Sequence, residues 1–218
     1  QKLDLLCYTD PDADRLGIVV PTLSDEQSLY GKWRILKAND VWTLFLWYML
    51  DVLSKKNNSF LRDIDKSFIV KSFLTSDSLA YISKKYGLEC IDGMVGFSDL
   101  TTIVMNEWSK NKTNVGMFEE SCGFGIAGNS TQQLHILEKD GLLSLAFIIE
   151  ILAYAKSQNT SIQDILNHIF LDPEIGFFTT TRKELPQNDV FEGIKGEIFL
   201  RKILKNIENL YERCNKQI

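Results

Sequence analysis

Between Phe68 and Phe170, short apolar segments rich in aromatic and β-branched residues alternate with longer segments of helical periodicity. The short segments, which are predicted strands, are 68–73, 88–91 and 115–118. The longer segments, which are predicted helices, are 76–86, 100–108, 140–157 and 161–170. Strands that alternate with helices indicate a mostly parallel sheet with helices on both faces. The sequence therefore predicts a layered α/β fold.

The flanking segments suggest a second structural part and two extensions. Residues 3–8 predict a buried strand, residues 16–20 a second strand after a polar loop, and residues 33–36 a short third one. Further predicted elements are a well-buried helix over 41–53, an edge strand over 177–181 and an amphipathic helix over 191–213. We interpret 1–35 as the end of one domain, and 36–218 as an α/β domain with a C-terminal helical extension.

Composition excludes several classes of protein. The 218 residues include 24 Lys and Arg against 29 Asp and Glu, a net charge of −5, which argues against nucleic acid or an anionic membrane as partner. No apolar run reaches the roughly 20 residues of a membrane span. The cysteines are scattered, without metal-ligand spacing, at Cys7, Cys90, Cys122 and Cys214. Unpaired cysteines favour a reducing compartment, so we expect a cytoplasmic protein.

Asp10, Asp12 and Asp14 form an acidic loop between the first two predicted strands. Two carboxylates about 4 Å apart repel by about 4 kcal/mol at an effective dielectric constant of about 20, and a divalent cation removes this penalty. An EF-hand calcium loop needs Gly at its sixth and Glu at its twelfth position, where this chain has Arg15 and Pro21. Mg²⁺, which completes its shell with water or phosphate oxygens, fits better. The alternative is a solvated acidic turn whose side chains point apart.

The acidic loop and three further segments together lead to a family resemblance. Asp10–Gly17 resembles the metal-binding loop of the α-D-phosphohexomutases, the phosphoglucomutase and phosphomannomutase enzymes. Phe118–Gly123 is similar to the sugar-binding loop of that family, and Glu138–Gly141 to the segment before a long helix. Gly93–Phe97 resembles a loop that ends in a sugar-contacting basic residue. The Glu-Glu-Ser form of the sugar loop favours the phosphoglucomutase branch, and hence glucose over mannose.

The resemblance implies a four-domain enzyme of which this chain carries the tail of the second domain and essentially all of the third. Such enzymes exchange a phosphoryl group between positions 1 and 6 of a hexose through a phosphoserine and a bisphosphorylated sugar. The serine loop of the first domain would precede Gln1, and nothing after Asp172 resembles the phosphate-clamping loop of the fourth. We therefore expect an excerpt of a longer protein, without a catalytic residue of its own and inactive alone.

The resemblance also assigns roles to residues of this chain. Asp10, Asp12 and Asp14 would hold Mg²⁺, and Arg15 would lie beside the transferring phosphate. Glu119 and Ser121 would bind hydroxyl groups of the sugar, since a carboxylate and a hydroxyl together accept and donate hydrogen bonds. Lys71, at the end of a predicted strand, is expected to be solvated.

Two departures from the family pattern, and separately the acidic loop itself, leave other functions open. Ser98 stands where many relatives have Lys or His, and 128–133 lacks the Asp, His and Arg that relatives often place there. These differences leave a non-catalytic sugar-binding module on a decayed mutase fold as one alternative. The other is a metal-dependent glycosyltransferase, in which an Asp-x-Asp loop holds Mn²⁺ against a nucleotide diphosphate.

Overall fold

The computed structural model describes residues 3–56, 63–131, 137–181 and 193–215. The chain divides into two units, Gln1–Thr180 and Thr181–Ile218. The first unit contains, in chain order, β1 (Leu6–Thr9), β2 (Leu16–Pro21), α1 (Gln27–Tyr30), β3 (Trp33–Ile35), α2 (Ala38–Trp47), the π-helical segment η1 (Tyr48–Leu53), α3 (Ser54–Lys56), the 3-10 turn η2 (Ile64–Lys66), β4 (Ser67–Ser72), α4 (Ser78–Tyr86), β5 (Glu89–Gly93), α5 (Phe97–Trp108), β6 (Thr113–Glu119), β7 (Gly123–Gly125), α6 (Gly141–Ser157) and α7 (Ile162–Leu171).

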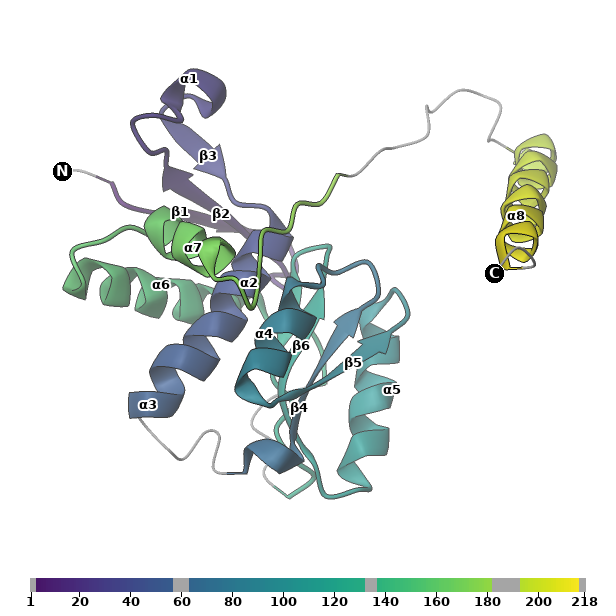
Figure 1. The fold of residues 1–218 in the computed structure, drawn as a ribbon, viewed down its shortest axis with the longest axis horizontal. Helices are drawn as coiled ribbons and strands as arrows, with labels where there is room; N and C mark the ends of the chain where they lie inside the picture. Colours follow the sequence, from purple (N-terminus) through teal and green to yellow (C-terminus); the bar gives the residue numbers. More distant parts are fainter. Residues whose placement is uncertain (1–2, 57–62, 132–136, 182–192, 216–218) are drawn as a thin grey trace. The chain divides into compact units, whose positions relative to one another are not determined.

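The larger sheet has the strand order β5-β4-β6-β7, with β4 parallel to β5 and β6, and β7 antiparallel to β6. Successive side chains of a strand point to opposite faces. Phe68 and Val70 of β4 accordingly pack with residues of α5, whereas Ile69 joins the core that includes Leu79 and Ile82 of α4. Helices therefore cover both faces (Figure 1), which confirms the predicted layered α/β fold.

The smaller sheet has the order β1-β2-β3 and is antiparallel throughout. Alternate residues of β2 are buried and join the core that also contains Ile148 of α6. The prediction that the first strand is buried is wrong, because Leu6 and Tyr8 of β1 remain 46% and 53% exposed. This strand lies at an edge, where only one face packs against the rest of the unit.

The structure differs from the sequence-based expectations at three places. The segment 177–181 forms no strand; instead Thr180 Oγ1 accepts a hydrogen bond from Asn39 Nδ2 at 2.8 Å, which ties it to the start of α2. The predicted helix over 41–53 begins at Ala38 and changes to π-helical geometry at Tyr48. The antiparallel strand β7 was not predicted, because three residues rich in glycine give no strand signal of their own.

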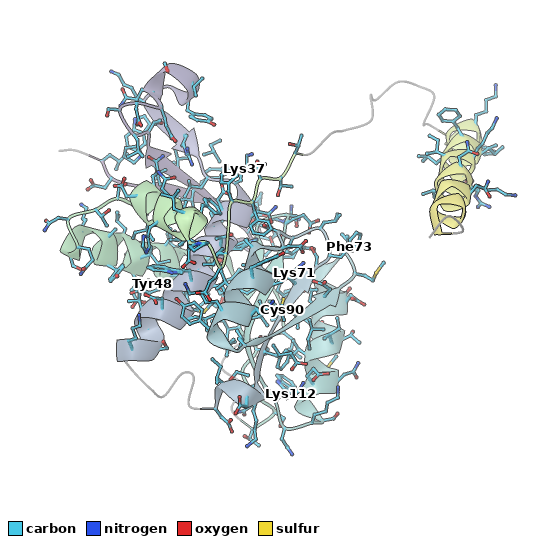
Figure 2. The ribbon with its side chains drawn as sticks, viewed as in Figure 1. Lys37, Tyr48, Lys71, Phe73, Cys90 and Lys112 are labelled. Carbon is cyan, nitrogen blue, oxygen red and sulfur yellow. The ribbon has the colours of Figure 1, made fainter. Side chains whose placement is uncertain are left out.

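Lys71, expected to be solvated, is only 1% exposed. Figure 2 labels its side chain within the first unit. Its Nζ lies 2.8 Å from Asp92 Oδ1, 3.1 Å from Asp77 Oδ1 and 3.2 Å from the carbonyl oxygen of Thr75. Burial by itself would lower the pKa of Lys71, but hydrogen bonds to the two carboxylates outweigh it and raise that pKa. The lysine thus keeps its charge inside the fold and connects the ends of β4 and β5 with the start of α4.

The second unit consists, where it is described, of helix α8 (Gly193–Asn215). The helix was predicted over 191–213, and its predicted first residues lie outside the described part, as do the last two residues of the loop 128–133. Within the described residues, no single helix combines the length and apolar composition of a membrane span. Taken together, α6 and α7 would meet those criteria, but they are bent by 86°.

Candidate functional site

The acidic loop connects β1 to β2 and is closed by a tight turn. The backbone N–H of Ala13 donates to the carbonyl oxygen of Asp10 at 3.0 Å, and Ala13 takes a left-handed φ of 58°. The backbone N–H of Arg15 donates to Asp10 Oδ1 at 3.2 Å. One carboxylate oxygen from each of Asp10, Asp12 and Asp14 lies within 4.8 Å of the other two. The turn thus brings the three predicted metal ligands together, and the solvated turn with splayed side chains is not what forms.

The electrostatics of this loop favour a bound cation. Desolvation and the neighbouring Asp10 carboxylate raise the pKa of Asp14, although Lys139 opposes this shift. Desolvation would also raise the pKa of Asp10, but the Arg15 backbone N–H, the hydrogen bond with Asp14 and the Arg15 charge together lower it. Among the described residues, the buried Asp14 Oδ1 has no hydrogen-bond partner. A cluster of carboxylate oxygens, one of them buried without a hydrogen-bond donor, fits a hard divalent cation.

Arg15 lies beside the acidic loop, and its position beside a transferring phosphate stays a prediction. Its Nε is 3.5 Å from Asp10 Oδ2 and 3.6 Å from Asp14 Oδ1, and its side chain is half exposed. The guanidinium therefore pairs with the loop carboxylates in this structure, and its exposed nitrogens remain accessible to an anion.

The predicted sugar loop is the turn between β6 and β7, where Glu119 pairs with Gly123. Glu119 is 5% exposed, and its Oε2 accepts a hydrogen bond from Ser121 Oγ at 2.7 Å. The indole N–H of Trp42, in α2, donates to the carbonyl oxygen of Glu119 at 2.8 Å. The two predicted sugar-binding side chains are thus in contact with each other and fixed from α2.

The acidic loop and the sugar loop lie side by side. Arg15 forms a β-bridge with Gly123, more than 100 residues along the chain. Lys139 Nζ lies 3.4 Å from Asp14 Oδ2 and 3.5 Å from Glu119 Oε2, so one ammonium group links both loops. Sequence reasoning gave Lys139 no role, although the similarity of Glu138–Gly141 to a family segment was the available signal.

Helix α6 begins directly against the acidic loop. Asp140 Oδ1 caps the helix by accepting from the backbone N–H of Leu143, and the N–H of Gly141 donates to the carbonyl oxygen of Ala13 at 3.1 Å. A Cβ atom on Gly141 would lie 2.5 Å from the Ala13 oxygen and 3.0 Å from the Arg15 oxygen, both backbone atoms. Glycine is therefore required here by close approach of two backbones.

Gly141→Ala is accordingly expected to lower the free energy of unfolding by about 1–3 kcal/mol, because the backbone of the acidic loop must move away from α6. The displaced loop should also bind divalent cations more weakly. Urea denaturation and a calorimetric Mg²⁺ titration measure the two effects. The control is Leu142→Ala, the next residue, whose side chain is 64% exposed and should change stability by less than about 0.5 kcal/mol. Equal behaviour of the two variants would contradict the prediction.

Ser98 lies in the first turn of α5 and is exposed; its carbonyl oxygen accepts hydrogen bonds from Thr101 and Thr102. It provides a hydroxyl where the family pattern has a cation. The cysteines Cys7, Cys90 and Cys122 are free thiols, as expected.

Comparisons with known proteins identify the family of this chain. Residues 38–171 match the family model described as phosphoglucomutase/phosphomannomutase, alpha/beta/alpha domain III. Human glucose 1,6-bisphosphate synthase is 28% identical over 162 residues, which are 74% of this chain and 24% of that protein. Phosphopentomutase from Mus musculus is 26% identical over 180 residues, 83% of this chain and 27% of that protein. This chain therefore spans about a quarter of the length of these relatives.

A solved structure shows the same fold. The phosphoglucomutase pp63/parafusin from Paramecium, in its open form, superposes with a TM-score of 0.51 at 20% identity, over 76% of this chain and 24% of that one. The family model covers well over half of the 218 residues. The resemblance to the α-D-phosphohexomutases is thus confirmed, and the chain belongs to the phosphoglucomutase/phosphomannomutase family, whose domain III it contains.

Proposed function

We propose that this chain is the metal-binding and sugar-binding part of a phosphohexomutase that interconverts hexose 1-phosphate and hexose 6-phosphate. The observation that carries the proposal is the position of Lys139, whose ammonium group lies within 3.5 Å of both Asp14 and Glu119. A phosphoryl-transfer site needs positive charge beside the phosphate and hydrogen bonds that orient the acceptor. The two neighbouring loops offer both within one small region.

Each residue in this proposal has a defined task. Asp10, Asp12 and Asp14 hold Mg²⁺, which supplies positive charge where negative charge develops on the transferring phosphoryl group. Arg15 contributes a second, fixed positive group. Glu119 accepts and Ser121 donates hydrogen bonds to hydroxyl groups of the sugar. Lys139 limits repulsion between the Asp14 and Glu119 carboxylates and so allows the two loops to approach.

The proposal also includes the predicted domain organisation. Residues 1–35 belong to the end of a second domain, and 36–218 to a third domain with its extension. The phosphoserine and the phosphate clamp come from other domains of a longer protein. We propose glucose over mannose because the loop has the Glu-Glu-Ser sequence, and a cytoplasmic location because the cysteines are unpaired. The family assignment favours this function over the glycosyltransferase alternative.

The test is a coupled assay that follows glucose 6-phosphate. The full-length protein should convert glucose 1-phosphate when Mg²⁺ and a trace of glucose 1,6-bisphosphate are present, and chelation of Mg²⁺ should abolish turnover. The 218-residue chain alone should show none. Turnover by the isolated chain would contradict the domain assignment. A full-length protein that binds sugar phosphates but converts neither glucose nor mannose phosphates would instead support the non-catalytic sugar-binding module.

A further inference from the structure

Glu120, between the two proposed sugar-binding residues, makes its contact with a different element. Its Oε2 accepts a hydrogen bond from Ser72 Oγ at 2.5 Å, and Ser72 is the last residue of β4. The Ser72 side chain is completely buried. The proposed sugar contacts of Glu119 and Ser121 do not use this part-buried hydrogen bond, so it has no role in the function proposed above.

The hydrogen bond between Glu120 and Ser72 continues to a second hydroxyl group. Ser72 Oγ lies 2.9 Å from Thr75 Oγ1, and Thr75 is also buried. A hydroxyl group has one proton to donate, and Ser72 gives its proton to the Glu120 carboxylate, which can only accept when ionised. Ser72 then has no proton left for Thr75, so the Thr75 hydroxyl group donates its single proton either to Ser72 Oγ or to the carbonyl oxygen of Phe118, 3.3 Å away. The carboxylate of Glu120 therefore fixes the direction in which the buried Ser72 hydroxyl group donates.

Two neighbouring residues of the sugar loop are held from outside the hairpin. The carbonyl oxygen of Glu119 accepts a hydrogen bond from the indole N–H of Trp42 at 2.8 Å. Glu120 is held through its side chain. The loop then passes through Cys122, which has a left-handed φ of 69°. A non-glycine residue in that conformation costs about 1–3 kcal/mol and persists only where the surroundings hold it.

We propose that Glu120 is a positioning residue, which with Ser72 fixes the loop so that Glu119 and Ser121 keep the geometry in which they bind the sugar. The identity of what the loop binds rests on the function proposed above. The hydrogen bond between Glu120 and Ser72, which we call the anchor, is a contact between described residues and does not depend on that function. Since Ser72 ends β4, an interior strand of the larger sheet, the loop takes its position from that strand.

The first experiment measures the alkylation rate of Cys122 by mass spectrometry after exposure to a maleimide. Burial raises the pKa of the Cys122 thiol, so it should react slowly in the unmodified protein. Glu120→Ala and Ser72→Ala should raise its rate about tenfold, as for loss of one hydrogen bond to a charged group. Glu120→Gln retains an acceptor oxygen and should restore a rate near that of the unmodified protein. Cys7 and Cys90 should be unaffected in all variants.

An unchanged Cys122 rate in Glu120→Ala would overturn the proposal, and so would an equal increase at all three cysteines, which indicates general loss of stability. The matched control is Ser109→Ala, which removes an exposed hydroxyl bonded to the carbonyl oxygen of Asn106. This control should leave the rate at Cys122 as it is.

The second experiment is kinetic and uses the full-length protein. Glu120→Ala should raise KM for glucose 1-phosphate about tenfold, with a smaller fall in kcat and unchanged Mg²⁺ affinity. A lower kcat with unchanged KM and a lower melting temperature would contradict a positioning role. The two proposals fail separately. Absence of turnover in the unmodified protein counts against the proposed function, whereas the alkylation rates decide about the anchor.

Discussion

Asp12→Asn is expected to reduce mutase turnover of the full-length protein at least about a hundredfold, the scale of losing a group that stabilises charge in a transition state. The substitution preserves the shape of the side chain but removes one of three negative charges that lie within 4.8 Å of each other. The amide is a weaker ligand for Mg²⁺ than the carboxylate. The repulsion that favours cation binding also becomes smaller, so both effects lower the affinity for the metal.

Two measurements decide this prediction. Isothermal titration with Mg²⁺ should show weaker binding in Asp12→Asn, and excess Mg²⁺ should restore part of the turnover. Asp25→Asn is the matched control, because Asp25 is an exposed aspartate outside the acidic loop. If Asp12→Asn leaves both the Mg²⁺ affinity and kcat unchanged, the acidic loop does not hold the metal ion as proposed.

Glu119→Gln is expected to reduce kcat/KM for the sugar phosphate by about tenfold to a hundredfold, since a hydrogen bond to a charged group contributes about 1.5–3 kcal/mol. The variant keeps the volume of a side chain that is 5% exposed, so the hairpin should remain intact. It loses the charge that pairs with Lys139 and the strong acceptor for Ser121. The lower kcat/KM should therefore result mainly from a higher KM, because Glu119 is proposed to bind the substrate.

Steady-state kinetics combined with thermal denaturation test this prediction. Glu174→Gln, an exposed glutamate that pairs with Lys85, is the control for loss of one surface charge and should leave kcat/KM unchanged. If Glu119→Gln keeps the kcat/KM of the unmodified protein, the hairpin between β6 and β7 is not the sugar site.

The local patterns of the sequence were sufficient to predict that the chain folds as an α/β protein. The β-branched residues of β2 and the helical periodicity of α4 and α7 are properties of neighbouring residues, so they are visible without a partner. The acidic loop was predicted for a similar reason: three carboxylates within five residues repel each other wherever the chain places them. The edge position of β1 and the absence of a strand at 177–181 were missed. Both depend on which segments lie next to them.

The sequence by itself determined the layered α/β fold and the presence of an acidic turn. Only the tertiary structure decided that Asp14 and Glu119 share Lys139, that Gly141 contacts the backbone of Ala13, and that the buried Lys71 keeps two carboxylate partners. The physical reason is the separation of these groups along the chain. A charged side chain is stable inside a protein only beside a specific partner, and packing of distant segments selects that partner.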